Sequence, residues 1–130
     1  MKNGVRLVKL DVLRPHERVK KSHLDVLGMQ IYRDGFIDNP VIVDKNTKII
    51  LDGHHRFTIA RNLGLRFLPV YFVDYRHDAI KVDSWRDHEL ITKDMVVNAG
   101  LSGKLLRPKT SRHHIPERPA GLRIPLEKLK

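Results

Sequence analysis

The segment Asp52-Gly53-His54-His55-Arg56 combines a carboxylate, a glycine and three side chains that carry nitrogen donors. It follows the apolar residues 49–51, which are typical of a short buried strand, and begins a segment with apolar residues at helical spacing. A strand, a glycine turn and a helix in this order direct the unpaired N–H groups of the first helical turn at one point. The segment therefore predicts a phosphate or carboxylate site, with a plain strand-to-helix turn as the alternative.

A second cationic group lies near the end of the chain, at Lys109-Thr110-Ser111-Arg112-His113. The formal net charge is +10, which favours anionic partners such as nucleotides, phosphorylated metabolites or nucleic acid. A flexible basic tail is the alternative for this segment. However, apolar residues resume at Leu122 and Ile124, so we expect a final strand to anchor the far end. We therefore expect residues 109–114 to lie against the helix that starts near His54.

The composition limits the class of protein. The chain has 130 residues, of which 41% are hydrophobic, and this predicts one folded domain with a core of its own. The absence of cysteine excludes disulfides, thiolate zinc sites and a cysteine nucleophile. No apolar run approaches the ~20 residues that cross a bilayer, and residues 1–4 do not resemble a signal peptide, so we expect a cytoplasmic protein without membrane partners.

The periodicity of apolar residues predicts an α/β fold, with a small mixed sheet and helices packed against it. Strands are expected at 5–10, 41–43, 48–51 and 67–73, and helices from Ser22 to Gly35, from His54 to Gly64 and from Thr92 to Gly100. Ser22 begins a capping-box pattern, Thr92 is the expected cap of the last helix, and Gly100 is its expected end. Pro69 indicates an edge strand or an early position in its strand. We expect a single domain over 1–130, with a core at 1–75 and a C-terminal extension at 76–130.

Three further features are candidates for ligand contact. Asn39 precedes the strand at 41–43, and the hairpin that follows brings Asp52 to the same edge; the alternative for Asn39 is a plain Asn-Pro turn. Trp85 stands among charged residues and is equally consistent with a core anchor or a pocket wall. The adjacent histidines His54 and His55 point about 100° apart on a helix, so we do not expect them to share a zinc ion.

The order of these pieces resembles the ParB/sulfiredoxin superfamily. The resemblance is carried by the residues Leu13-Arg14-Pro15-His16-Glu17, Gly35-Phe36-Ile37-Asp38-Asn39-Pro40-Val41-Ile42-Val43 and Ile50-Leu51-Asp52-Gly53-His54-His55-Arg56. His54 stands at the position of the sulfiredoxin cysteine, which removes sulfiredoxin chemistry. The chain is more similar to the ParB-like free serine kinases, on the basis of Pro15-His16-Glu17, Asp52 to Arg56, Asp83-Ser84-Trp85 and Lys109 to His113.

This resemblance implies transfer of a phosphoryl group from ATP or ADP, with Mg²⁺, to free L-serine, giving O-phosphoserine. It implies that Glu17 accepts the serine proton, although an exposed surface charge is the alternative from the sequence alone. The expected phosphate and nucleotide contacts are Gly53, His54, His55, Arg56, Lys109, Thr110, Ser111, Arg112 and His113. Asp52 is expected to bind Mg²⁺ or orient serine, with a helix cap as the alternative. Asn39 and Trp85 are the expected serine contacts.

Two other functions remain as alternatives at this stage. A ParB-like module that binds nucleotide or DNA without kinase activity is consistent with the net charge of +10. A metal-dependent phosphodiesterase would use the histidines, but the sequence has no evident carboxylate cluster for two metal ions.

Overall fold

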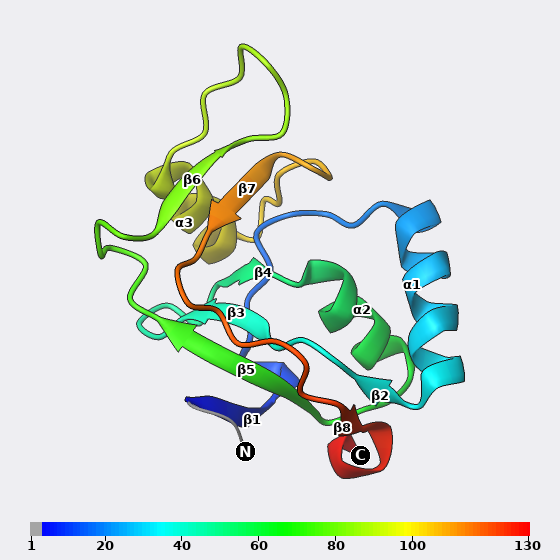
Figure 1. Cartoon of the computed structure of the whole chain (residues 1–130). Helices are drawn as coiled ribbons and strands as arrows, with labels where there is room; N and C mark the ends of the chain where they lie inside the picture. Colours follow the sequence, from blue (N-terminus) through cyan, green and yellow to red (C-terminus); the bar gives the residue numbers. More distant parts are fainter. Residues whose placement is uncertain (1–3) are drawn as a thin grey trace.

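The computed structural model describes residues 4–130 and contains one central mixed sheet (Figure 1). Residues 1–3, which belong to the segment without signal-peptide features, lie outside this range. The four strands of the central sheet are arranged in the order β1-β5-β3-β4. They span Val5–Lys9 (β1), Phe67–Val73 (β5), Val41–Asp44 (β3) and Ile50–Asp52 (β4). β5 runs antiparallel to β1 and parallel to β3, while β3 and β4 form the expected hairpin. The predicted α/β fold is therefore confirmed.

Both faces of the central sheet are buried, because successive residues of β3 and β4 face two different apolar clusters. Val41, Val43 and Ile50 pack in a cluster with α2 (His54–Asn62) and with part of α1 (Lys21–Asp34). Ile42 and Leu51 pack in a second cluster that includes residues of α3 (Lys93–Ser102). Two-sided burial explains why these strands are continuous apolar runs in the sequence.

The longest apolar strand, β5, lies inside the sheet, and the edge position considered for Pro69 is wrong. Pro69 pairs with Leu7 of β1 and precedes Val70, the first residue of β5 that pairs with β3. The alternative of an early position in the strand is therefore confirmed. There the missing N–H of proline leaves the ladder between β5 and β3 intact.

Two of the predicted helix boundaries are wrong. α1 begins at Lys21 after the N-cap residue Lys20, which has no side-chain cap, so Ser22 lies inside the first turn. α3 begins after Thr92 as predicted, and the Thr92 hydroxyl accepts the N–H of Met95. However, α3 continues through Gly100 and ends before Gly103, which has a φ of 76°. Gly100 is needed for packing, because a Cβ there would lie 2.7 Å from the Ile49 side chain.

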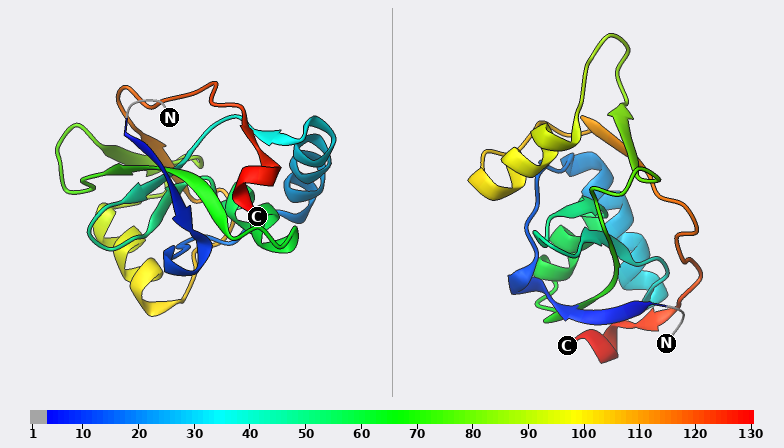
Figure 2. Two further views of the ribbon diagram at one scale, coloured as in Figure 1. Left: turned by 90° about the horizontal axis from the view of Figure 1, so that it is seen from below. Right: turned by 90° about the vertical axis from the view of Figure 1, so that its left-hand side faces the viewer.

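Two small antiparallel sheets involve the C-terminal part of the chain. β6 (Lys81–Ser84) pairs with β7 (Ser111–His114), and the sequence pattern predicted neither strand. β8 (Ile124–Pro125) pairs with β2 (Phe36–Ile37), which confirms a final anchoring strand. Figure 2 shows the segment between β7 and β8 running along one side of the molecule. Short 3-10 helices, Leu10–Val12 and Leu126–Leu129, complete the described fold. None of the helices within residues 4–130 has the length and apolar character required to span a membrane.

Candidate functional site

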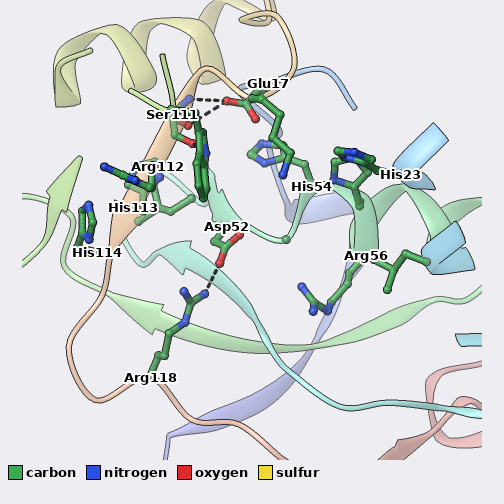
Figure 3. Close-up of a pocket in the computed structure, with 16 residues that line it drawn as sticks. Glu17, His23, Asp52, His54, Arg56, Ser111, Arg112, His113, His114 and Arg118 are labelled. Carbon is green, nitrogen blue, oxygen red and sulfur yellow. Dashed lines mark hydrogen bonds and ion pairs between the residues drawn. The ribbon is translucent and has the colours of Figure 1, made fainter. Parts of the chain in front are cut away.

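A pocket of about 550 Å³ lies between the start of α2 and strand β7 (Figure 3). It is lined by residues from β4, α1, α2, β7 and the connecting segments: Glu17, His23, Leu27, Leu51, Asp52, Gly53, His54, His55, Arg56, Trp85, Lys109, Ser111, Arg112, His113, His114 and Arg118. Most residues that the sequence predicted as site residues therefore lie together. Two predicted residues are not part of the lining. Thr110 is buried, and its hydroxyl donates to the Arg107 carbonyl. Asn39 lies outside the lining as well.

The floor of the pocket is the start of α2. Gly53 is the N-cap residue and has a φ of 107°, a conformation that residues with a side chain rarely adopt. A Cβ at this position would also lie 3.0 Å from Cγ2 of Val41. The first bond of the helix joins the N–H of Phe57 to the carbonyl of Gly53. The N–H groups of residues 54–56 precede this bond, so the first turn offers unpaired donors to an anion.

Glu17 is held at the opposite side of the pocket by residues that lie far along the chain. Its Oε1 accepts the N–H groups of Thr110 and Ser111 at 3.1 and 2.9 Å, and the hydroxyl of Ser111 at 3.0 Å. No hydrogen bond reaches Oε2 from within residues 4–130. The backbone of Glu17 forms a bridge with Leu106, which fixes the loop. Glu17 is half-buried, so the alternative of an exposed surface charge is wrong.

Asp52 is paired with Arg118, which comes from the segment between β7 and β8. Figure 3 shows this pair, and Arg56 also lines the pocket. Burial lowers the pKa of Arg56, and the nearby Asp52 opposes that shift. The sequence did not indicate Arg118, because nothing in its local pattern shows that the connecting segment crosses the pocket.

Three histidines of the pocket, His54, His55 and His113, have pKa values below the usual value, which favours their neutral form. His54 accepts the N–H of His16 on Nε2 at 3.1 Å, so the neutral ring carries its hydrogen on Nδ1. Burial lowers the pKa of His54 well below its usual value, and the His16 ring adds to this effect. Burial also lowers the pKa of His113 to about 3, and the His113 ring contacts the hydroxyl of Tyr75 at 2.8 Å. Burial, with Lys109 nearby, lowers the pKa of His55.

Trp85 is a pocket wall, which decides between the two interpretations of this residue. The residue is 53% exposed, and its Nε1 donates to the Ser111 carbonyl at 3.0 Å. The cations of Arg112 and Lys109 lie 5.1 and 5.3 Å from the ring centroid. Arg112 also forms a bidentate pair with Asp83, at 2.8 and 3.0 Å. The basic segment thus lines the pocket as a strand braced by β6, not as a flexible tail.

The carboxylates of the pocket are compatible with a metal ion that arrives with phosphates. Among residues 4–130 there is no group of three or more His, Cys, Asp or Glu side chains able to hold a metal ion by themselves. Mg²⁺ bound with a nucleotide commonly needs only one or two carboxylates, because phosphate oxygens and waters complete its shell. Asp52 fits this limited role, whereas the two-metal phosphodiesterase hypothesis finds no carboxylate cluster in this part of the chain.

Known proteins with similar sequences and structures were compared with the chain. No protein-family model matches it. A ParB-like protein of Sulfolobus acidocaldarius is 41% identical over 73 residues, which are 56% of this chain and 36% of that protein. An ATP-dependent L-serine kinase of Staphylothermus marinus is 31% identical over 83 residues, 61% of this chain and 33% of that protein. A solved structure of a free serine kinase in complex with AMP has a TM-score of 0.90 at 17% identity, covering 100% of this chain and 95% of the other.

The structural match shows which fold the chain has. The chain has the fold of the free serine kinase, in agreement with the predicted ParB/sulfiredoxin-like architecture. The resemblance to ParB-like proteins and L-serine kinases is likewise confirmed. The chain spans about a third of the length of these two relatives.

Proposed function

We propose that the protein is a kinase that transfers a phosphoryl group from ATP or ADP to the hydroxyl of free L-serine or a similar small metabolite. A cytoplasmic location, where nucleotide and free serine occur together, belongs to this proposal. The observation that carries it is the position of Glu17. One carboxylate oxygen is fixed by neutral donors, and the other is left for a substrate in the pocket whose floor is the start of α2.

Phosphoryl transfer needs a clamp for the phosphate, cations that offset its charge and an acceptor for the hydroxyl proton. The N–H groups at the start of α2 and the Arg56 side chain would clamp the phosphate. Lys109 and Arg118 would offset its charge from the other side of the pocket. Glu17 would accept the hydroxyl proton on Oε2, and Mg²⁺ bound with the nucleotide would add further charge neutralisation beside Asp52.

The ionic pair between Asp52 and Arg118 suggests how the pocket accepts a nucleotide. A phosphate is a stronger partner for arginine than a half-exposed carboxylate is, because it offers more charge and several acceptor oxygens. Binding would therefore turn Arg118 from Asp52 to the phosphate and release Asp52 for Mg²⁺ or for the amino group of serine. Trp85 would form the wall beside the serine.

The second candidate is a ParB-like module that binds nucleotide or duplex DNA without phosphoryl transfer. The net charge of +10 and the ParB-like relative favour this candidate. However, an anionic polymer contacts an outer surface, whereas Arg56, Lys109 and Arg118 line a pocket that also contains Glu17 and Asp52. A pocket of this kind suits a small substrate.

The test is to identify the product. The purified chain is incubated with Mg²⁺, L-serine and either ATP or ADP, and phosphoserine is sought by mass spectrometry. We expect phosphoserine with at least one donor and none when serine is omitted. If no donor gives phosphoserine and duplex DNA binds with a sequence preference, the kinase proposal is wrong and the ParB-like module replaces it.

A further inference from the structure

His16 is a fully buried polar residue that lies directly behind Glu17 and has no role in the proposal above. Its ring is 0% exposed, and it contacts the Ile50 carbonyl through Nδ1 at 2.6 Å. Its other nitrogen, Nε2, lies 2.9 Å from the hydroxyl oxygen of Ser111. The same hydroxyl lies 3.0 Å from Oε1 of Glu17. Ser111 is therefore in contact with both groups at once.

The Ser111 hydroxyl has a single hydrogen and lies between two acceptors. A carbonyl only accepts, so Nδ1 of His16 must carry the hydrogen that faces Ile50. In the neutral ring, Nε2 is then a bare acceptor facing Ser111. The ionised carboxylate of Glu17 is also only an acceptor. The Ser111 hydroxyl has one hydrogen for these two acceptors, so one of them goes without it in any given state.

The surroundings of His16 favour the neutral ring. The rings of His54 and His113 lie 4.5 and 5.8 Å from it, and both are neutral because burial lowers their pKa values. Burial lowers the pKa of His16 itself to about 4. Within residues 4–130, the carboxylate linked to His16 by hydrogen bonds is Glu17, through the Ser111 hydroxyl.

We propose that the Ser111 hydroxyl is a switch, donating its hydrogen to Glu17 before the reaction and to His16 once Glu17 has taken the substrate proton. This inference rests on the proposed function of Glu17 as the base. Hydrogen bonds to a charged acceptor are stronger than those to a neutral one, so the hydrogen stays on Oε1 while Glu17 is ionised. When Glu17 becomes neutral this preference is lost, and Nε2 of His16 receives the hydrogen. The exchange stabilises the protonated state of Glu17 and makes it a better base.

The step is balanced without any further reactant. The substrate O–H bond breaks and its proton moves to Oε2 of Glu17, while the substrate oxygen forms a bond to phosphorus and the bond to the leaving phosphate breaks. The Ser111 O–H bond stays intact and only rotates from Oε1 to Nε2. Loss of the proton from Glu17 to solvent reverses the rotation. His16 and Ser111 act through Glu17 and are therefore positioning residues.

The first test does not depend on activity. Imidazole ¹⁵N spectra of the labelled chain are recorded near pH 7 for the unchanged protein, Glu17→Gln and Ser111→Ala, with the His16 ring assigned through its bonds to the His16 backbone signals. We expect Nδ1 to be protonated and Nε2 bare. In Glu17→Gln, Nε2 should shift toward the value of a protonated nitrogen, because a neutral amide competes less for the hydroxyl hydrogen. In Ser111→Ala it should keep the value of a bare nitrogen, because the hydroxyl of the unchanged protein already donates to Glu17. A protonated Nε2 in the unchanged protein, or an Nε2 signal that ignores Glu17→Gln, overturns the proposal.

The second test uses a matched pair of substitutions at His16 together with the phosphoserine assay. Asparagine can donate to the Ile50 carbonyl but does not reach Ser111, whereas glutamine can present an acceptor near the position of Nε2. We expect kcat to fall about tenfold in His16→Asn with KM for serine unchanged, the scale of one lost hydrogen bond at a catalytic group. In His16→Gln, kcat should stay within about threefold. In a Ser111→Ala background the difference between the two should vanish.

The two tests separate the two proposals. The expected ¹⁵N shifts in a chain that makes no phosphoserine would support the hydroxyl switch and refute the kinase proposal. Phosphoserine formation with equal kcat in His16→Asn and His16→Gln would support the kinase and refute the switch. If the His16 variants do not fold, the spectra of the unchanged protein, Glu17→Gln and Ser111→Ala still decide the matter.

Discussion

Glu17 and Asp52 line the same pocket, but the protein holds the two carboxylates in different ways. Glu17 is fixed by two backbone N–H groups and one hydroxyl, and no cation is paired with it among residues 4–130. Asp52 is paired with the cation Arg118, which also lines the pocket and lies on the segment between β7 and β8. Neutral donors fix the orientation of a carboxylate without cancelling its charge, whereas an arginine cancels the charge and can itself be drawn away by a phosphate. The difference suggests a fixed base at Glu17 and an exchangeable ion pair at Asp52.

The largest expected effect is on turnover and comes from Glu17→Gln. The amide keeps the size of the side chain and still accepts the N–H groups of Thr110 and Ser111, but it cannot take a proton. We expect kcat for phosphoserine formation to fall by a factor of about 10² or more, the scale of losing a general base. Nucleotide affinity, measured by calorimetry, should stay the same. Equal turnover in the variant would assign the base elsewhere.

A smaller effect, on binding, is expected from Arg118→Ala. The variant removes a charge-assisted contact to phosphate, so we expect nucleotide affinity to fall about tenfold and to depend less steeply on salt. Arg123→Ala is the matched control, because Arg123 lies on the same C-terminal segment but stacks over Phe36, outside the pocket lining. If the two substitutions weaken binding equally, Arg118 has no specific role and the exchange of partners is refuted.

The lowered pKa values of His16 and His113 should make the stability of the protein depend on pH. The pKa values of His16 and His113 are lowered from 6.5 to about 4 and about 3, so the unfolded chain binds more protons than the folded one below pH 6.5. The free energy of unfolding is therefore highest above pH 6.5. It decreases as the pH falls from 6.5 toward 4. For His16 alone the loss is on the order of 3 kcal/mol.

Urea unfolding at a series of pH values measures this loss. His113→Gln should reduce the slope of the free energy of unfolding against pH in the same window, because one of the two depressed histidines is removed. A free energy of unfolding that does not change between pH 6.5 and pH 4 would show that these rings titrate normally in the folded protein.

The smallest effect is expected from Arg112→Ala. Arg112 is exposed and already paired with Asp83, which raises the pKa of the guanidinium and shares its charge. We therefore expect nucleotide affinity to fall by only about two- to threefold, less than for Arg118→Ala. Asp83→Asn is the variant to compare with Arg112→Ala. It removes the carboxylate paired with Arg112, so the guanidinium can contact phosphate and nucleotide binding should become slightly stronger. A tenfold loss in Arg112→Ala would place the phosphate nearer to β7 than to the segment that carries Arg118.

The start of α2 and Glu17 also differ in how well the sequence predicted them. The start of α2 is encoded locally: Gly53 must provide the positive φ, and the apolar residues before and after it define the strand and the helix. The prediction of an anion site at this turn accordingly rests on adjacent residues. Glu17 was proposed only through the family resemblance, because its partners Thr110 and Ser111 lie more than 90 positions away.

The parts that the sequence did not predict depend on pairing between distant segments. β6 contains charged and polar residues, and it is defined by its register with β7 rather than by its own hydrophobicity. Arg118 lies in a connecting segment whose path is set by the pairing of β8 with β2. Gly100 carries the usual signal for a helix end, but close contact with Ile49 keeps it inside α3. Local patterns do not contain these tertiary constraints.

The most direct test of the division of roles is a single-turnover measurement on two variants side by side. Glu17→Gln and Arg118→Ala are each saturated with nucleotide, mixed with saturating L-serine and quenched at short times, and the phosphoserine formed is measured by mass spectrometry. Saturation removes the binding defect, so Arg118→Ala should retain a rate within about tenfold of the unchanged protein, while Glu17→Gln should stay slower by about 10² or more. Equal rates for the two variants would contradict the assignment of Glu17 as the fixed base and of Asp52 and Arg118 as the exchangeable pair.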